Sequence, residues 1–203
     1  GTAIVAEETY KSADASVDSQ VVKLKASNAD VFLDLTIAKF TVQAIRKAAE
    51  IGWKPLHVIN TNSISISGVL KPAGLDNSQG LVSATFYKDP TDPRWKDDAG
   101  VKEFHAFLDK YYPDADRNSN MFPYAYLTAQ HMVQILKQSG DNLTRENVLR
   151  QAASIKDAQF PLLLPGIKYN TSPTDYQPLE QMQLIEFKGE RWELIGSVIG
   201  NSD

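Results

Sequence analysis

The sequence predicts an α/β protein in which helices flank a parallel sheet. Residues 31–33 form a short apolar run, typical of a strand that is buried on both faces of such a sheet. Residues 39–51 repeat apolar side chains at helical spacing and end at Gly52. A second strand is expected at 56–59, after Pro55. Strand, helix and strand in this order make a βαβ unit, whose two strands run parallel.

The amino-terminal residues extend this alternation. They predict a strand at 2–6 and a short helix at 18–27, opened by a polar cap at Asp14, Ser16 or Asp18. The first sixty residues then follow the order β-α-β-α-β, which is typical of an α/β sheet. A buried strand with no leading helix or signal peptide before it also suggests that the chain begins in the middle of a larger fold.

The middle of the chain predicts a change of architecture. A short helical piece near 69–70 and a strand at 81–86 follow a Ser-rich loop. Residues 88–93 are rich in turn formers and lack apolar periodicity, so we expect a boundary there, acting as a hinge between two lobes. Beyond it, helices are predicted at 97–112 and 123–138.

The carboxyl-terminal part predicts one more helix and a hairpin. Thr144 is suited to cap a helix with Glu146 in its first turn. A short strand is expected at 167–169. Two alternating segments around Lys188-Gly189 predict a β-hairpin at 182–187 and 192–198.

Composition excludes several classes of function. The 203 residues carry a net charge of -4 and no cysteine, so neither a basic nucleic-acid surface nor a disulfide or thiolate metal site is predicted. No apolar run approaches the roughly 20 residues that span a bilayer. His57, His105 and His131 stand in no metal-binding spacing, and no nucleophile motif or phosphate loop is present. We therefore expect no cofactor, no metal and no catalysis.

Polar residues at the carboxyl ends of the predicted strands are the first candidates for a site, because ligands of open α/β sheets bind there. Asp34 lies in an apolar strand and must find hydrogen bonds or a partner. It either holds a ligand or a catalytic proton, anchors a neighbouring loop, or faces outward at the end of the strand. The loop at 60–67 is dense in short hydroxyl and amide groups, which either bind an oxygen-rich solute or cap the next helix.

An aromatic patch precedes and enters the second of the long helices. Core packing explains some of its members, and a polar-tipped aromatic at a cleft also suits stacking on a ligand. Its members are Met121, Phe122, Tyr124 and Tyr126. We expect Tyr126 to share one apolar stripe with Ala129, Val133 and Leu136.

Several segments in the same order resemble the type I periplasmic solute-binding proteins, specifically those of branched-chain amino acid ABC importers. The similarity spans nearly the whole chain, although no single motif is diagnostic. The matching segments are QVVKLKASNADV (20–31), QAIRKAAEIGWKP (43–55), VLKPAGL (69–75), KDPTDPRW (88–95), LLPGI (163–167) and GERWEL (189–194).

The resemblance implies two α/β lobes joined by three crossovers, which close on a solute in the cleft. Residues 1–84 then look like lobe 2 without its first strand and helix. Residues 85–180 look like the returning portion of lobe 1, and residues 181–203 form the hairpin that rejoins lobe 2. The chain alone would hold half of a solute site, and its exposed sheet surface would favour self-association.

The resemblance also implies a set of ligand-binding residues. In the loops after two strands these are Thr36, Ile37 and Ala38, and Asn60, Thr61, Asn62 and Ser63. Amino-acid binders of the family place an acid in the second loop, where this sequence has Asn62. A buried ammonium without a counter-charge is costly, so the solute is expected to be an aromatic or aliphatic carboxylate, with a branched-chain amino acid as the alternative if Asp34 pairs with the ammonium. Phe122, Tyr124 and Tyr126 are expected at the cleft wall.

These features predict a non-enzymatic, periplasmic or otherwise extracytoplasmic receptor that binds a small-molecule solute and presents it to a membrane ABC permease. Hinge closure would be the mechanism, with contacts in both lobes stabilising the closed state. The alternative is a ligand-sensing domain of the same fold in a signalling system.

Overall fold

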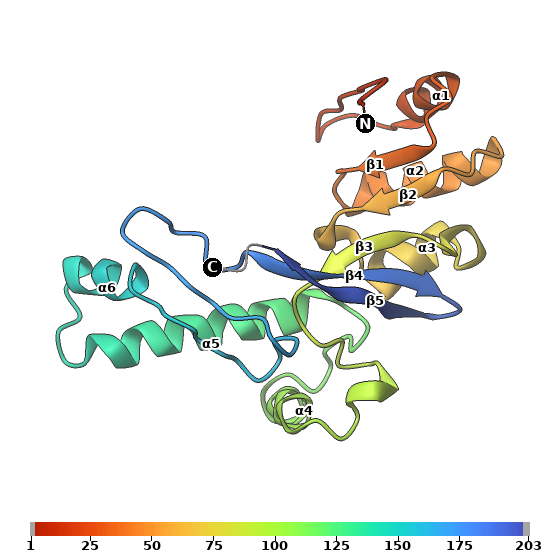
Figure 1. The fold of residues 1–203 in the computed structure, drawn as a ribbon. Coiled ribbons are helices and arrows are strands. Elements are labelled where there is room, and N and C mark those ends of the chain that lie inside the picture. Colours follow the sequence, from red (N-terminus) through yellow and green to blue (C-terminus); the bar gives the residue numbers. More distant parts are fainter. Residues whose placement is uncertain (1–2, 201–203) are drawn as a thin grey trace. The chain divides into compact units, whose positions relative to one another are not determined.

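The computed structural model describes residues 3–200, which form two compact units of α/β structure (Figure 1). Of the described residues, the first unit contains 3–84 together with Leu184–Ile195, and the second contains Thr85–Gln183 and 196–200. The assignment of these units to the two lobes of a binding protein stays a prediction. Among the described residues, no helix is both long and apolar enough to cross a membrane.

The first unit contains the predicted strand–helix–strand alternation. Its elements are α1 (Asp18–Ala26), β1 (Val31–Asp34), α2 (Ala38–Glu50), β2 (Leu56–Ile59), the 3₁₀ turn η1 (Thr61–Ser63), the π-helical turn η2 (Ile66–Leu70), α3 (Lys71–Ala73), the 3₁₀ turn η3 (Asp76–Ser78) and β3 (Val82–Thr85). The remaining elements are η4 (Pro93–Trp95), α4 (Ala99–Tyr111), α5 (Met121–Ser139), α6 (Arg145–Ala152), β4 (Gln181–Lys188) and β5 (Arg191–Gly200).

The strands form one sheet in the order β1-β2-β3-β4-β5. β1 pairs in parallel with β2, and β2 pairs in parallel with β3, so the predicted βαβ unit is confirmed. The last two strands form the predicted hairpin, whose turn contains Gly189 at φ +62°, a backbone conformation that suits glycine. Within the first unit, the Trp192 indole N–H of β5 donates to the carbonyl of Ile64 at 2.9 Å.

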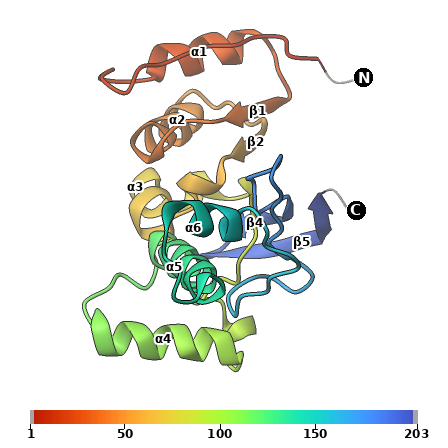
Figure 2. The same ribbon diagram turned by 90° about the vertical axis from the view of Figure 1, so that its left-hand side faces the viewer.

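Helix α2 covers one face of the sheet beside β1, and α1 packs against α2 (Figure 2). The core of this layer contains Val17, Val21, Phe32, Phe40, Ala44 and Ala48. The other face of β1 is open within the described residues, because Leu33 is 62% exposed and Val31 is 36% exposed. The prediction that this strand is buried on both faces is therefore wrong for this chain, in which β1 is an edge strand covered on one side.

Two further predictions in the amino-terminal part are wrong. Residues 3–6 form no strand, since Ile4 is 83% exposed and this segment pairs with no other; Thr2 lies outside the described residues. Helix α1 has Val17 as its N-cap and no side-chain cap, because Asp18 is already its first residue. The Ser16 hydroxyl instead accepts a hydrogen bond from the Asp18 N–H at 3.0 Å.

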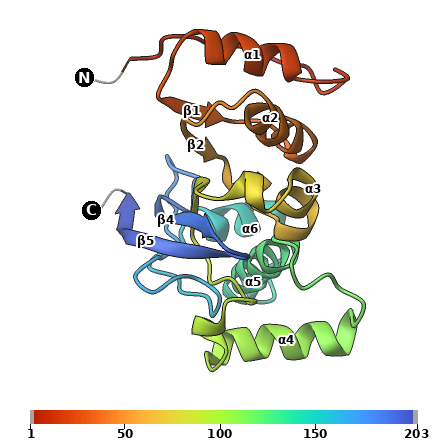
Figure 3. The same cartoon turned by 90° about the vertical axis from the view of Figure 1, so that its right-hand side faces the viewer.

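The second unit contains the predicted helices α4, α5 and α6. α4 and α5 pack against each other with crossed axes (Figure 3), and the rings of Phe104 and Tyr126 are 5.3 Å apart at their contact. Thr144 caps α6 as predicted, accepting a hydrogen bond from the Asn147 N–H at 3.4 Å. The expected strand at 167–169 is reduced to a single bridge between Ala158 and Tyr169.

The buried side of α5 is not the predicted stripe. Its buried residues are Pro123, Leu127, Ile135 and Ser139. Ala129, Val133 and Leu136, which were expected on the buried stripe, are exposed instead. Since α5 is apolar on more than one side, periodicity alone did not determine which side faces the core.

Truncation of Phe40 tests the core of the first unit. Phe40 lies on α2 and is fully buried in this core, so Phe40→Ala is expected to reduce the free energy of unfolding by about 3–5 kcal/mol. Urea denaturation measures this loss. Leu35→Ala, at a side chain that is 77% exposed, is the control and should change stability by less than about 0.5 kcal/mol. Equal losses in both variants would contradict this description of the core.

Candidate functional site

The loops that follow β1 and β2 meet at one edge of the sheet in the first unit. The Asn60 side-chain amide donates to the Thr36 carbonyl at 2.7 Å, and the Ser63 hydroxyl donates to the same carbonyl at 3.0 Å. Parallel strands bring their carboxyl ends to the same edge, which explains this meeting. The structure therefore brings together the two predicted loop segments, 36–38 and 60–63.

Buried hydroxyl groups continue this contact beneath the loops. The Thr41 hydroxyl, in the first turn of α2, is 2.9 Å from the Thr36 hydroxyl and 2.9 Å from the Ser63 hydroxyl. Thr41 and Ser63 are fully buried. Because a buried hydroxyl without a partner is costly, these contacts fix both loops relative to α2.

Asp34 anchors the first of these loops. Its carboxylate Oδ1 accepts hydrogen bonds from the Thr36 N–H at 3.0 Å and from the Thr36 hydroxyl at 2.6 Å. Its other oxygen, Oδ2, is 3.3 Å from Nε2 of His57. Asp34 is only 1% exposed, so it does not face outward, and of the roles predicted from the sequence the structure supports the loop anchor.

Most predicted side chains of this site are engaged in holding the loops. The Asn60 side-chain oxygen accepts from the Asn62 N–H at 3.0 Å, and the Thr61 hydroxyl donates to the Ala84 carbonyl. Ser63 uses its hydroxyl inside the protein, as described above. Their part in solute binding stays a prediction, and the geometry indicates that it is to shape the loops.

Groups open to solvent remain at the amino end of α2 and in the second loop. Ile37, Ala38 and Asn62 are exposed. The Ile37 N–H donates to the Tyr10 hydroxyl at 3.0 Å, whereas the N–H groups of Ala38 and Lys39 make no hydrogen bond to any described residue. The first N–H groups of a helix lack intrahelical partners and carry partial positive charge, so this end of α2 can accept an anion.

Lys39 is a residue that the site prediction missed. The signal was present in the sequence, because a helix expected to begin at 39 offers its first N–H groups to solvent. Its side chain is engaged elsewhere, since the Lys39 ammonium donates to the Asp14 carbonyl at 3.1 Å. The backbone of Lys39, rather than its charge, therefore faces the candidate site.

The three predicted aromatic residues do not form one surface. Phe122 and Tyr126 point toward the α4 side of α5, where Phe122 contacts Tyr112 and Tyr126 packs against Phe104 and Phe107. Burial, followed by the neighbouring charge of Glu103, raises the pKa of Tyr126, whose hydroxyl donates to the Glu103 carboxylate at 3.2 Å.

Tyr124 lies on another side of α5 because residues two apart on a helix point in different directions. It packs edge-on against Phe86 at 6.2 Å and is 49% exposed. Its hydroxyl makes no hydrogen bond within the described residues. Of the three aromatic residues, Tyr124 thus keeps a polar tip available to a solute.

The histidines lie in separate surroundings. His105 contacts the Pro90 carbonyl at 3.0 Å, and His131 packs against the rings of Phe160 and Tyr169. Burial lowers the pKa of His131. No group of three or more His, Cys, Asp or Glu side chains within residues 3–200 is arranged to hold a metal ion.

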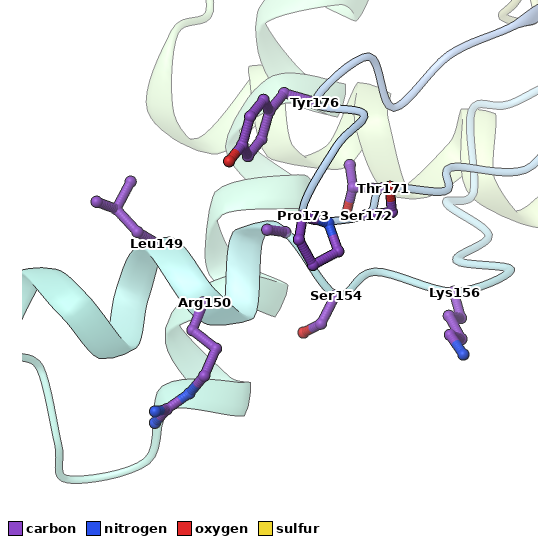
Figure 4. Close-up of a pocket in the computed structure, with 9 residues that line it drawn as sticks. Leu149, Arg150, Ser154, Lys156, Thr171, Ser172, Pro173 and Tyr176 are labelled. Atoms are coloured by element: carbon purple, nitrogen blue, oxygen red, sulfur yellow. The ribbon is translucent and has the colours of Figure 1, made fainter.

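The second unit has an open cavity of about 530 Å³ that shares no residue with the predicted site. Figure 4 shows its side chains coming from α6 and from the loops beyond it. The lining residues are Leu149, Arg150, Ala153, Ser154, Lys156, Thr171, Ser172, Pro173 and Tyr176. Two basic residues, Arg150 and Lys156, and no acid line it.

Asn60 and Asn62 provide a matched pair for testing the loop geometry. Asn60→Ala removes one donated and one accepted hydrogen bond and is expected to lower the free energy of unfolding by about 1–2 kcal/mol. The side chain of Asn62 is exposed, so Asn62→Ala should change stability by less than about 0.5 kcal/mol. Thermal or urea unfolding of both variants measures the difference. A loss no larger at Asn60 than at Asn62 would show that these bonds do not hold the loops.

Comparison with known proteins places this geometry in a family. A sequence profile described as periplasmic binding protein matches residues 1–191. A search of curated proteins finds no match. Among solved structures, the fold is similar to a branched-chain amino acid ABC transporter protein from Thermus thermophilus with bound valine, at 15% identity and a TM-score of 0.78, covering 96% of this chain and 52% of the other.

Two other solved structures are also similar in fold to this chain at low sequence identity. One is a leucine-binding protein from Thermotoga maritima, at 13% identity and a TM-score of 0.69, covering 94% of this chain and 50% of the other. The second is a solute-binding protein of an ABC transporter from Rhodopseudomonas palustris in complex with 4-hydroxybenzoate, at 17% identity and a TM-score of 0.74, covering 98% of this chain and 52% of the other.

The chain therefore spans about half the length of the structures that it matches. At these identities the similarity shows the fold, which is that of the type I periplasmic binding proteins, as the sequence predicted. The profile match covers nearly all of the sequence, and the chain belongs to the periplasmic binding protein family.

Proposed function

We propose that the chain is part of the extracytoplasmic solute-binding component of an ABC importer and that its solute is a small organic carboxylate. The observation that supports this most directly is the pair of N–H groups of Ala38 and Lys39, which face solvent without a partner in the described part of the chain. Partial positive charge at the amino end of a 13-residue helix favours a carboxylate at this position.

The charges around these N–H groups disfavour an α-amino acid as the solute. The loops at 35–38 and 60–67 contain no acid, and the resemblance implies that Asn62 stands where amino-acid binders of the family have one. Asp34 does not replace it, because its carboxylate is buried and already paired with Thr36 and His57. An ammonium group bound beside these loops would lose its hydration without gaining a counter-charge from them.

The solutes in two of the similar structures differ in whether they carry an ammonium group. Valine and 4-hydroxybenzoate both carry a carboxylate, and only valine carries an ammonium group. A site with N–H donors for the carboxylate and an amide in place of the acid matches the chemistry of the amine-free compound. In the second unit, Tyr124 is the residue that we assign to stacking on an aromatic solute, because it is half exposed and its hydroxyl is available.

The proposed protein would be a receptor without catalytic activity. Binding would stabilise the closed arrangement of its lobes, and a membrane permease would recognise that state. A branched-chain amino acid remains the alternative solute, and it would require an acid outside the two loops.

A ligand screen tests the class of solute. The full-length protein is expected to show a raised Tm with benzoate-like or aliphatic carboxylates and no shift with leucine, isoleucine or valine. Binding at 100 times the dissociation constant adds roughly 2.7 kcal/mol of stability, which a thermal-shift assay detects. Stabilisation by branched-chain amino acids would overturn the assignment of an amine-free solute.

A substitution that adds a negative charge at Asn62 tests whether this residue lies beside the bound carboxylate. Asn62→Asp puts a negative charge beside the proposed carboxylate, at a cost of about 2 kcal/mol for charges about 8 Å apart at an effective dielectric constant of about 20. Calorimetry is therefore expected to show a roughly thirtyfold weaker affinity for the carboxylate. Asn28→Asp makes the same change of charge before β1, at the opposite end of the strand, and should leave affinity unchanged. Equal affinities of both variants would remove Asn62 from the site.

A further inference from the structure

The cavity of the second unit has walls that are bonded to each other. The end of α6 and the chain just after it form one wall, and residues 171–176 form the other. The Thr171 hydroxyl accepts a hydrogen bond from the Ile155 N–H at 2.9 Å and donates to the Ala152 carbonyl at 2.7 Å. The Thr171 N–H donates in turn to the Ile155 carbonyl at 2.9 Å. The cavity is therefore formed in advance, which lowers the entropy cost of binding a ligand.

The lining of this cavity is mainly apolar. Carbon atoms form most of its surface, and Leu149, Pro173 and Tyr176 are among the residues that supply them (Figure 4). Leu149 is 62% exposed and Tyr176 is 72% exposed, so an apolar ligand lying against them would remove apolar surface from water. The cavity volume of about 530 Å³ is also in the range of small-molecule sites.

The two positive charges of the cavity have no acidic partner within residues 3–200. The Lys156 ammonium forms neither a hydrogen bond nor an ion pair there, and the adjacent Asp157 pairs with Lys168 instead, at 2.9 Å. The Arg150 guanidinium donates only to the neutral side-chain oxygen of Asn147, at 2.5 Å. An anionic group would give both cations a partner, and its hydrogen bonds to them would be charge-assisted.

We propose that this cavity is a binding site for a small organic anion with an apolar body. The body would lie against Pro173 and Tyr176, and the anionic group would face Arg150 and Lys156. Figure 4 shows both cationic side chains extending away from the Tyr176 ring, so the apolar and the charged parts of the site are separated. The site shares no residue with the predicted solute site, and the inference does not depend on the proposed function.

Three compounds of matched chemistry test the class of ligand on the full-length protein. 2-Naphthoate has a ring and a carboxylate, 2-naphthamide keeps the ring without the charge, and acetate keeps the charge without the ring. Calorimetry is expected to detect binding of 2-naphthoate at about 1 mM or below and much weaker binding of the other two. Amide chemical-shift changes on addition of 2-naphthoate are expected within 149–156 and 171–176.

Four variants test the assigned residues. Lys156→Gln removes a charge from an exposed side chain and is expected to weaken 2-naphthoate binding about threefold, and the double variant with Arg150→Gln about tenfold. Tyr176→Ala removes the ring and should weaken binding about tenfold. Lys137→Gln is the matched control for the charge, because Lys137 is an exposed residue in the last turn of α5 outside the cavity, and it should leave affinity unchanged.

Three outcomes would overturn the inference. The first is 2-naphthamide binding as tightly as 2-naphthoate, which would show that the cations take no part. The second is an unchanged affinity in both the double charge variant and Tyr176→Ala, with the variants folded as judged by their Tm. The third is a set of chemical-shift changes confined to the loops at 36–38 and 60–63. That result would support the proposed solute site and leave the cavity without a ligand of this class.

Discussion

The buried carboxylate of Asp34 is the constraint on which the rest of the candidate site depends. A carboxylate at the end of an apolar strand is tolerated only when its oxygens are paired, and here each oxygen has a different partner. Oδ1 binds the turn that begins α2, and Oδ2 faces the neighbouring strand. Displacement of either partner would leave a buried charge without its hydrogen bonds, which is costly. The turn and the neighbouring strand are therefore held in place relative to Asp34.

This requirement explains why so many polar side chains of the two loops face inward. Thr36, Thr41, Asn60 and Ser63 form bonds mainly with one another, and their hydroxyl and amide groups are used before any solute arrives. What the loops leave open are backbone N–H groups and the exposed side chains around them. A dense run of short polar residues therefore indicates how the site is built rather than which of its atoms meet a solute.

The sequence predicted the order of elements in the first unit because each signal there was local. The stripe with Phe40, Ala44 and Ala48, the positive-φ Gly52 and the strand after Pro55 each reflect a backbone preference that the structure confirms. The wrong predictions concern which face of a strand or helix is covered by the rest of the protein. The strand expected at 2–6 and the stripe at 126–136 were read from apolar character, which does not state what lies opposite an apolar face.

The sequence predicted which loops form the candidate site, but it did not predict which of their atoms contact one another. The rule that ligands bind at the carboxyl ends of parallel strands located residues 36–38 and 60–63, which the structure brings together. The pairing of Asp34 with His57 depends on the register of β1 against β2, which sequence spacing does not determine. Tyr124 and Tyr126 were separable in advance, because positions two apart on a helix face different directions.

Backbone donors and side chains have separate roles in the proposed site. An N–H at a helix end attracts a carboxylate whatever side chain the residue carries, so this part of recognition places little demand on sequence. Discrimination among carboxylates must then come from the exposed groups nearby, of which Asn62 is the one in the second loop. Two solved structures of the same fold, 15% and 17% identical to this chain, hold valine and 4-hydroxybenzoate, which is compatible with these separate roles. A change from an acid to an amide at this loop position would then decide whether an ammonium group is accepted.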